Sequence, residues 1–423
     1  MAVIKPFRAV RPREDLASKI AALPYDVYNR EEAKKEVQRE PESFLQIDRA
    51  ETMCKEGINL YSEEVYQKAH DLLWKKIQNG IFIQDEKPCY YLYELIMGNR
   101  SQTGIVACAS IDDYENGIIK KHECTRAEKE QDRICHVDAC DAQTGPIFLA
   151  YRKNEELKQI IKEVKEEKNL FDFQTRDGII HRGWKIAEKD RIDRIEKLFE
   201  KTKQIYIADG HHRAASAVKV GLKRRKEHPD YTGKEEFNFF LSVLFSEEEL
   251  LIMDYNRVVK ELNGYKKEEF LKKVEEKFTV ISSENMVKPE HKGEMGMDLE
   301  GEWYLLRTKE EYKNDDPVEG LDVSYLQREL LSPVLGIEDP KTDKRISFVG
   351  GIRGIEELEK RVNKDCKVAF SMYPTTIQEL FEVADAGRMM PPKSTWFEPK
   401  LRSGLFLHLI GEEKEDSLRT KSR

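Results

Sequence analysis

The segment at residues 205–222, IYIADGHHRAASAVKVGL, constrains the fold more than any other part of the chain. It opens with four apolar residues rich in strand formers, which predicts a short strand. Asp209 and Gly210 are a turn pair, and the alanine-rich stretch after them predicts a helix that ends at Gly221. The segment therefore predicts a strand, a tight glycine turn and a helix.

Two histidines and an arginine open this predicted helix, as His211, His212 and Arg213. A helix N-terminus presents unpaired N–H groups and favours anions. An arginine in the first turn opposes the helix dipole, so its presence indicates a role outside the helix. Gly210 lets the backbone approach a ligand closely. We interpret the turn as a phosphate or carboxylate site; the alternative is a surface turn with incidental polar residues.

The composition is that of a soluble globular protein. The 423 residues suffice for two or three domains, and 36% are charged against 39% hydrophobic. The net charge of −8 does not favour non-specific binding to DNA or to anionic membranes. No apolar run approaches the roughly 20 residues of a membrane span. Seven scattered cysteines without a C-x-x-C pair fit a reducing compartment. We expect a cytoplasmic protein.

Acidic residues near the N-terminus are candidates for catalysis. Asn29 is expected to cap a helix that begins at Arg30, which places Glu31 and Glu32 in its first turn and Asp26 before it. Each carboxylate could act as a base or metal ligand beside the phosphate site. The alternative is that acids at this position stabilise the helix dipole. Asp26 is the preferred functional candidate because it lies outside the helix.

Hydrophobic periodicity predicts the surrounding elements and a division of the chain. We expect a helix after Ser62, strands over residues 90–97 and 102–110, and a central strand over 237–245. The predicted units are an N-terminal α/β unit (1–150), a core with the D-G-H-H-R turn (151–263), a C-terminal α/β unit (264–410) and a disordered tail (411–423).

A second charged stretch, residues 120–133, has the sequence KKHECTRAEKEQDR. Thr125 could cap a helix, with Glu128 at the capping-box spacing. The cations could clamp a nucleotide's phosphates, and Glu123 or Glu130 could hold Mg²⁺. The alternative is a salt-bridged surface helix. The candidate binding residues here are His122, Glu123, Thr125, Arg126, Lys129 and Arg133.

A third stretch, residues 390–404, contains three prolines that forbid a regular helix. It carries Lys393, Ser394 and Thr395 beside two aromatic residues. We interpret it as an anion-binding or substrate loop. The alternative is a rigid strap that packs Trp396 and Phe397 into the core.

The D-G-H-H-R sequence resembles a signature of the ParB/sulfiredoxin-like superfamily. Further segments resemble a widespread family of that superfamily catalogued as an uncharacterised domain, and together they span about residues 3–410. They are P-F-R-A (6–9), P-Y-D-V (24–27), S-F-L (43–45), H-E-x-T-R-x-x-K-E-x-D-R (122–133), G-P-I-F-L (145–149) and the proline-rich loop. The resemblance implies a mixed α/β (α+β) fold with a nucleotide-binding core.

Relatives in this superfamily phosphorylate free L-serine from a nucleotide. Carried to this chain, the resemblance implies that Gly210, His211, His212 and Arg213 bind phosphates and that Asp209 contacts the metal or the substrate. One of Asp26, Glu31 and Glu32 would be the base. The implied cofactors are ATP or ADP with Mg²⁺, the latter held by Asp209 and Glu123. The expected function is a kinase for free L-serine or a similar small hydroxyl compound, in a monomer or a homo-oligomer.

Two other classes of function are alternatives. A ParB-like nucleotide-dependent DNA-binding protein would need a basic recognition helix, which the acidic composition does not offer. A regulatory protein that binds nucleotide without turnover is the second, and a sulfiredoxin-like reductase, which needs a cysteine beside the histidines, is a lesser one.

Overall fold

The computed structural model describes residues 1–411, so nearly all of the predicted tail (411–423) lies outside the described residues. The chain forms two compact units. The first contains Met1–Leu250 and Pro399–Arg423, and the second contains Leu251–Glu398. The first two predicted units, 1–150 and 151–263, both contribute strands to the main sheet of the first unit. The predicted C-terminal unit is divided at Pro399.

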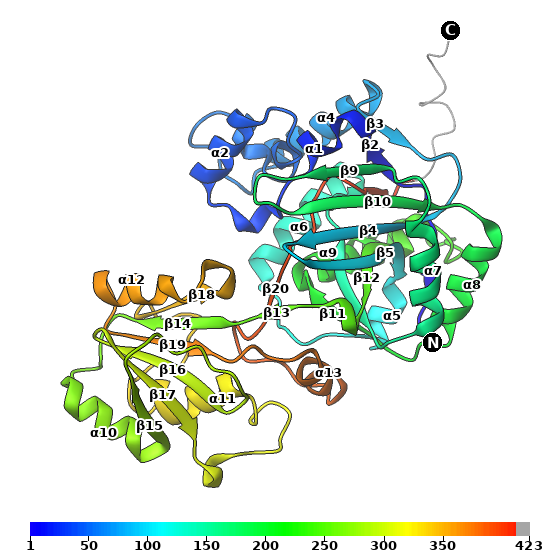
Figure 1. The fold of residues 1–423 in the computed structure, drawn as a ribbon. Coiled ribbons are helices and arrows are strands. Elements are labelled where there is room, and N and C mark those ends of the chain that lie inside the picture. The colour runs from blue at the N-terminus through cyan, green and yellow to red at the C-terminus, as the bar shows by residue number, and fades with distance from the viewer. Residues whose placement is uncertain (412–423) are drawn as a thin grey trace. The chain divides into compact units, whose positions relative to one another are not determined.

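A nine-stranded mixed sheet forms the centre of the first unit (Figure 1). Its order is β6-β11-β8-β12-β5-β4-β10-β9, with β1 paired to β5; the β6–β11 and β8–β12 pairs are parallel and the others antiparallel. The strands are β1 (Ile4–Lys5), β4 (Tyr90–Met97), β5 (Arg100–Ser110), β6 (Ile119–Lys120), β8 (Ile147–Tyr151), β9 (Phe171–Gln174), β10 (Ile180–Ile186), β11 (Ile205–Asp209) and β12 (Phe239–Ser246). Two small sheets pair β2 (Val10–Pro12) with β3 (Phe82–Gln84) and β7 (Ala142–Gln143) with β21 (His408–Leu409).

The sheet confirms the strand predictions and the mixed α/β fold class. β4 occupies the predicted residues, and β12 lies in the interior of the sheet between β8 and β5. Every residue of β12 except Ser246 is buried, because both faces of an interior strand are covered.

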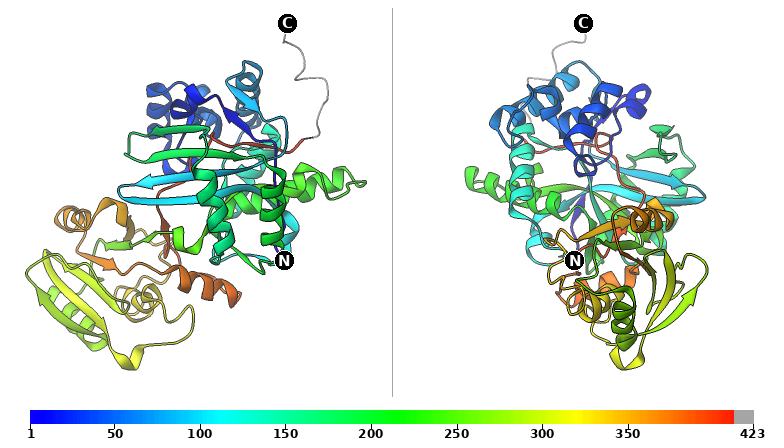
Figure 2. Two further views of the ribbon diagram at one scale, coloured as in Figure 1. Left: turned by 45° about the vertical axis from the view of Figure 1, so that its right-hand side comes forward. Right: turned by 90° about the vertical axis from the view of Figure 1, so that its left-hand side faces the viewer.

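Helices cover the sheet, and the helices of residues 17–78 form a separate cluster (Figures 1 and 2). α7, α8 and α9 pack apolar residues into the core of the main sheet, whereas α1 to α4 form a second core. The helices of this unit are α1 (Ala17–Ile20), α2 (Arg30–Arg39), α3 (Leu45–Asp48), α4 (Glu63–Gln78), α5 (Ile111–Glu115), α6 (Ala127–Cys140), α7 (Glu155–Lys165), α8 (Lys189–Glu200) and α9 (His211–Glu227), with 3₁₀ turns η1 (Glu14–Leu16), η2 (Tyr25–Val27), η3 (Ala50–Met53), η4 (Glu236–Asn238) and η5 (Glu247–Glu249).

The predicted end of α9 at Gly221 is wrong. The helix continues to Glu227, and Gly221 is a buried interior residue. A Cβ atom at this position would overlap the Phe237 carbonyl oxygen and lie 2.8 Å from Ile111 Cδ1. Gly221 is therefore required by close packing of α9 rather than by helix termination.

We expect Gly221→Ala to destabilise the first unit by about 1–2 kcal/mol. Alanine favours a helix over glycine by about 1 kcal/mol, but overpacking against a backbone oxygen costs about 1–3 kcal/mol or more. Urea unfolding measures the difference, and Lys226→Ala at an exposed position of the same helix is the matched control. A stability gain in Gly221→Ala would show that the contact is not tight.

The C-terminal strap, residues 399–411, crosses the first unit and is anchored by a buried histidine. His181 is fully buried on β10, and its Nδ1 lies 2.8 Å from the Tyr93 hydroxyl. Arg402 of the strap donates to His181 Nε2 at 3.4 Å and forms an ion pair with Asp177. Because an arginine only donates, Nε2 accepts and the neutral ring carries its proton on Nδ1.

Acid should weaken this anchor. Burial and the neighbouring Arg402 lower the pKa of His181 to about 3, whereas Asp177 raises it. Between pH 6.5 and the folded pKa, the unfolded chain therefore binds the proton and the folded chain does not, so stability falls as pH falls. We expect a loss of about 3 kcal/mol between pH 6.5 and 4 from this group. Urea unfolding against pH should be flatter in His181→Gln, whereas His70→Gln, on the partly exposed side of α4, should retain the slope.

The second unit contains an antiparallel six-stranded sheet of order β15-β17-β16-β19-β14-β18, with apolar clusters on its two faces. Its elements are β13 (Ile252–Met253), β14 (Tyr255–Val259), α10 (Lys267–Lys277), β15 (Phe278–Ser283), β16 (Glu294–Leu299), β17 (Glu302–Thr308), η6 (Glu310–Tyr312), α11 (Asp322–Leu326), the π-helical η7 (Gln327–Leu331), β18 (Ile346–Gly350), η8 (Gly351–Arg353), α12 (Glu356–Lys364), β19 (Val368–Met372), α13 (Ile377–Asp385) and β20 (Trp396–Phe397), which pairs with β13. Within residues 1–411, no helix has the length and apolar character needed to cross a membrane.

Candidate functional site

The turn between β11 and α9 forms the centre of the candidate site. Gly210 has a φ of 93°, a left-handed conformation that glycine adopts without strain, and α9 begins at the next residue. The Gly210 amide donates to Asp209 Oδ1 at 2.8 Å. The first-turn amides of α9 have no partner within the helix, so they present donors and a partial positive charge.

Arg213 extends from the first turn of α9 across this glycine turn. Its Nη1 donates to the Pro146 carbonyl oxygen at 2.8 Å. A Cβ atom on Gly210 would lie 3.4 Å from Arg213 Nε, and one on Gly145 would lie 3.1 Å from Nη1. Glycines at both positions therefore leave room for the guanidinium group, which lines a cavity.

Asp209 pairs with a residue that the sequence did not connect to it. Lys400 Nζ lies 2.8 Å from Asp209 Oδ2, although the two are 191 residues apart. Burial alone would raise the pKa of Asp209, but Lys400 and Arg213 outweigh burial and hold that pKa well below its usual range. The carboxylate is therefore ionised at the end of β11. A lysine in the proline-rich loop was the only sequence signal for this pair.

Both histidines of the turn accept hydrogen bonds from the 122–126 segment. The His122 amide donates to His211 Nε2 at 3.4 Å, and the Arg126 amide donates to His212 Nε2 at 2.9 Å. Each neutral ring therefore carries its proton on Nδ1. His211 Nδ1 lies 3.7 Å from the Glu123 carboxylate.

Burial keeps these imidazoles neutral. It lowers the pKa of His122 to about 4, and burial together with His122 holds the pKa of His211 well below its usual range. The rings of His122 and His211 meet edge to face, 4.4 Å apart. Burial is the main cause that lowers the pKa of His212, and the positive charge of Lys129 lowers it further, whereas Asp26 raises it. Neutral rings at the turn can hold neighbouring groups in place and donate through Nδ1.

The charged stretch forms α6, with a different start from the predicted one. Arg126 is the N-cap residue and has no side-chain capping bond, so the prediction that Thr125 caps this helix is wrong. Thr125 instead donates its hydroxyl to Glu130 Oε2 at 2.7 Å, because Glu130 is buried and also pairs with Lys219 of α9. Arg126 and Lys129 remain exposed, whereas Arg133 is 7% exposed and faces a cavity.

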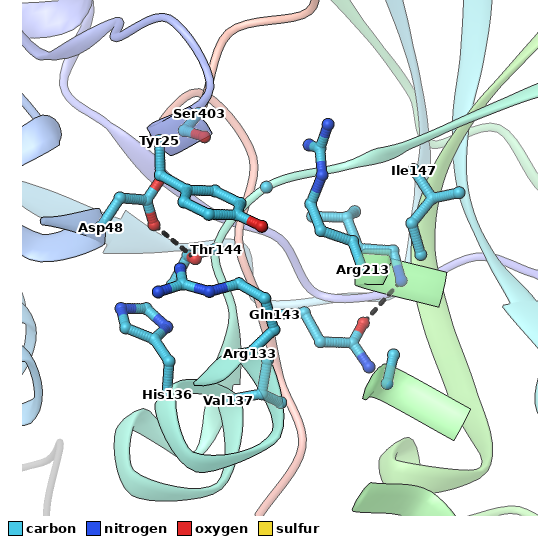
Figure 3. A pocket seen from close by; sticks show the side chains of 13 residues that line it. Tyr25, Asp48, Arg133, His136, Val137, Gln143, Thr144, Ile147, Arg213 and Ser403 are labelled. Atoms are coloured by element: carbon cyan, nitrogen blue, oxygen red, sulfur yellow. Dashed lines mark hydrogen bonds between the residues drawn. The ribbon is translucent and has the colours of Figure 1, made fainter. Parts of the chain in front are cut away.

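Two adjoining cavities lie beside the turn. A small one of about 30 Å³ is lined by Arg213, Gly145 and Ser403, and a larger one of about 220 Å³ extends toward Asp26 and Lys129. Residues shared by both are Tyr25, Asp48, Arg133 and His136. Figure 3 shows the Arg133 guanidinium under the Tyr25 ring, and its central carbon lies 4.0 Å from the ring centre.

The structure separates the three candidate acids. The side chain of Glu32 accepts from the Asn29 amide at 2.9 Å and Asn29 caps α2 in return, which confirms the predicted cap and gives Glu32 a structural role. Glu31 is exposed on α2 and does not line either cavity. Asp26 lies in η2, lines the larger cavity and affects the pKa of His212.

Lys393, Ser394 and Thr395 lie in the second unit. The Lys393 carbonyl accepts from Arg257 Nη2 at 3.1 Å, and the Ser394 carbonyl accepts from the Thr375 hydroxyl at 3.1 Å. These bonds hold residues 393–395 within the second unit.

The acids of the turn could bind Mg²⁺ only together with ligands from outside the protein. Within residues 1–411, no three His, Cys, Asp or Glu side chains are grouped closely enough to hold a metal by themselves. Mg²⁺ is usually bound by one or two carboxylates together with substrate phosphates and water. The ionised and partly exposed Asp209 fits such a site beside a phosphate group, and Glu123, near His211, could be a second ligand.

Solved structures with a similar arrangement are distant. SbnI with a C-terminal truncation from Staphylococcus aureus is 12% identical, with a TM-score of 0.38, and the match covers 74% of this chain and 91% of that one. A free serine kinase mutant in complex with ADP is 15% identical, with a TM-score of 0.36 and coverage of 70% and 92%. A conserved hypothetical protein from Pyrococcus furiosus is 16% identical, with a TM-score of 0.35 and coverage of 72% and 95%.

Sequence comparison assigns the family. No curated protein matches this chain. The model of the family described as "Protein of unknown function (DUF1015)" matches residues 4–324. Because this match spans well over half of the 423 residues, the chain belongs to the DUF1015 family.

Proposed function

We propose that this protein is a nucleotide-dependent phosphotransferase that phosphorylates free L-serine to O-phosphoserine, with ATP or ADP as the donor. The observation that carries the proposal is the glycine turn before α9. Here the first-turn amides of α9, the Arg213 guanidinium and the Lys400 ammonium group lie close to Asp209. Phosphoryl transfer needs mainly positioning and charge neutralisation, which such donors supply.

The D-G-H-H-R turn resembles the signature of the ParB/sulfiredoxin-like superfamily, which includes free L-serine kinases. This resemblance also supports a kinase function. In the proposal, the amides after Gly210 and the Arg213 guanidinium bind the transferred phosphate. His211 and His212 hold the 122–126 segment, and His212 Nδ1 offers a further donor. Arg126, which is exposed beside the turn, attracts the remaining phosphates.

The reaction is a direct displacement. The serine hydroxyl oxygen attacks the terminal phosphorus while Asp26 accepts the hydroxyl proton. The bond between that phosphorus and the bridging oxygen breaks, and the shortened nucleotide leaves with the electron pair. When bound, Mg²⁺ would neutralise charge on the phosphates. Asp209 and Glu123 would hold it, and Lys400 keeps Asp209 ionised.

Phosphorus NMR tests the proposal directly. The purified full-length protein is incubated with Mg²⁺, L-serine and either ATP or ADP, and we expect the signal of O-phosphoserine with one of the donors. The absence of product with both donors, while nucleotide still raises the melting temperature, would contradict the kinase and favour a nucleotide-binding regulatory protein.

A further inference from the structure

The larger cavity beside the turn has the charge pattern of a site for a small zwitterion. Its volume of about 220 Å³ is below the roughly 300–1,000 Å³ of pockets that enclose drug-sized ligands. Acidic and basic side chains both line it, together with four tyrosines. A ligand that fits must therefore be small and carry complementary charges.

The buried cations of this cavity are already neutralised. Arg49 Nε lies 2.6 Å from Glu51, and Arg49 Nη1 also donates to the Tyr28 carbonyl at 2.7 Å. Arg133 Nη2 lies 2.8 Å from Asp132, whose other carboxylate oxygen accepts from Tyr66. These ion pairs hold the side chains of the cavity wall in place, and they neutralise the positive charge of both arginines.

Asp48 is different because this buried carboxylate has no ion pair of its own within residues 1–411. The Arg133 guanidinium lies near it, but that group is already paired with Asp132, so one buried cation serves two carboxylates. Its side chain is 4% exposed and lines both cavities. Within the described part of the chain its only hydrogen-bond donor is the Thr144 hydroxyl, 2.8 Å from Oδ1 (Figure 3). A buried carboxylate is costly unless it is paired, so the cavity is complementary to a cationic group beside Asp48.

The rim supplies the opposite charge. Lys129 is exposed at the mouth of the cavity and forms no ion pair with any residue that the structure describes. It lies in the first turn of α6, which begins directly after Arg126, and the Arg126 amide donates to His212 Nε2 of the α9 turn at 2.9 Å. The rim lysine therefore lies on the side of the cavity that faces the α9 turn.

We propose that this cavity binds the acceptor as a free α-amino acid, with the ammonium group at Asp48 and the carboxylate toward Lys129. The inference rests on the proposed function, because it assigns the acceptor pocket of that reaction. The smaller cavity continues from the shared residues Asp48 and Arg133 to Arg213, which connects the amino-acid pocket to the phosphate-binding turn.

Isothermal titration without nucleotide tests the pocket separately from the kinase. The probes are L-serine, ethanolamine, which lacks the carboxylate, and 3-hydroxypropanoate, which lacks the ammonium. We expect L-serine to bind at least about tenfold more tightly than either truncated probe. Equal binding of 3-hydroxypropanoate and L-serine would overturn the assignment of Asp48.

Two variants address the two ends of the ligand. Asp48→Asn retains an acceptor for Thr144, and we expect it to lose L-serine binding at least about tenfold. Lys129→Ala, at an exposed site that does not affect folding of the core, should weaken L-serine but not ethanolamine. Unchanged L-serine affinity in either folded variant would refute the role of that residue, and Lys226→Ala is the control for surface charge.

The outcomes separate the two proposals. L-serine binding that depends on Asp48, without any phosphoserine product, would support the pocket and refute the kinase. Product formation that is unaffected by Asp48→Asn would support the kinase and refute the pocket.

Discussion

Arg213→Ala is expected to reduce phosphoserine formation by at least about 100-fold. Arg213 is the cation that extends across the glycine turn, and its guanidinium group is held by the Pro146 carbonyl. Removal of one preorganised donor to transition-state charge typically costs about 10²–10³ in kcat. Initial rates by phosphorus NMR or a coupled assay measure the effect.

The control for Arg213→Ala is Lys226→Ala near the C-terminal end of the same helix. It removes the same charge from an exposed position, so we expect unchanged activity. Arg213→Lys separates charge from geometry, because a lysine retains the charge without the planar fork of donors. Full activity in Arg213→Ala, with the fold retained, would remove the α9 turn from the catalytic site.

Local structure at the turn could be predicted from the sequence because it depends on neighbouring residues. A short apolar strand, a glycine that tolerates positive φ and an alanine-rich helix follow each other in β11 and α9. The Asn29 cap of α2 could be predicted for the same reason. The predictions of a cap at Thr125 and of a helix end at Gly221 were wrong, because contacts between distant residues determine the structure at both positions. Glu130 binds Thr125, and the Phe237 backbone contacts Gly221.

Contacts between distant segments could not be predicted from one sequence. Asp209 meets Lys400 only because the C-terminal strap returns to the first unit. Asp48 gave no pattern in the sequence, since it is one acid at the end of the short helix α3. Its importance depends on burial and on the lack of an ion pair of its own within the described residues, since the nearby Arg133 is paired with Asp132. Both are properties of the folded chain.

The second large expected effect is the loss of turnover when the catalytic base is replaced. Three acids were candidates, and their contacts in the structure differ in kind. The Glu32 carboxylate accepts a hydrogen bond from the Asn29 amide in the capping box of α2, and Glu31 does not line either cavity. Asp26 makes no hydrogen bond or ion pair with the residues that the structure describes, and it lines the cavity proposed for the acceptor. Asp26 is therefore the carboxylate that is available to a bound hydroxyl group.

We expect Asp26→Asn to lower kcat by about 10²–10⁴-fold, which is the usual contribution of a positioned general base. The amide retains the shape of the side chain but cannot accept the proton, so L-serine binding and the unfolding free energy should change little. Glu31→Gln should retain full activity. Glu32→Ala should lose about 1 kcal/mol of stability through the cap while turnover persists. Rate measurements and urea unfolding on all three variants distinguish these roles. If Asp26→Asn remained fully active while Glu31→Gln lost activity, the first turn of α2 would have to reach the acceptor, and the placement of the base in η2 would be wrong.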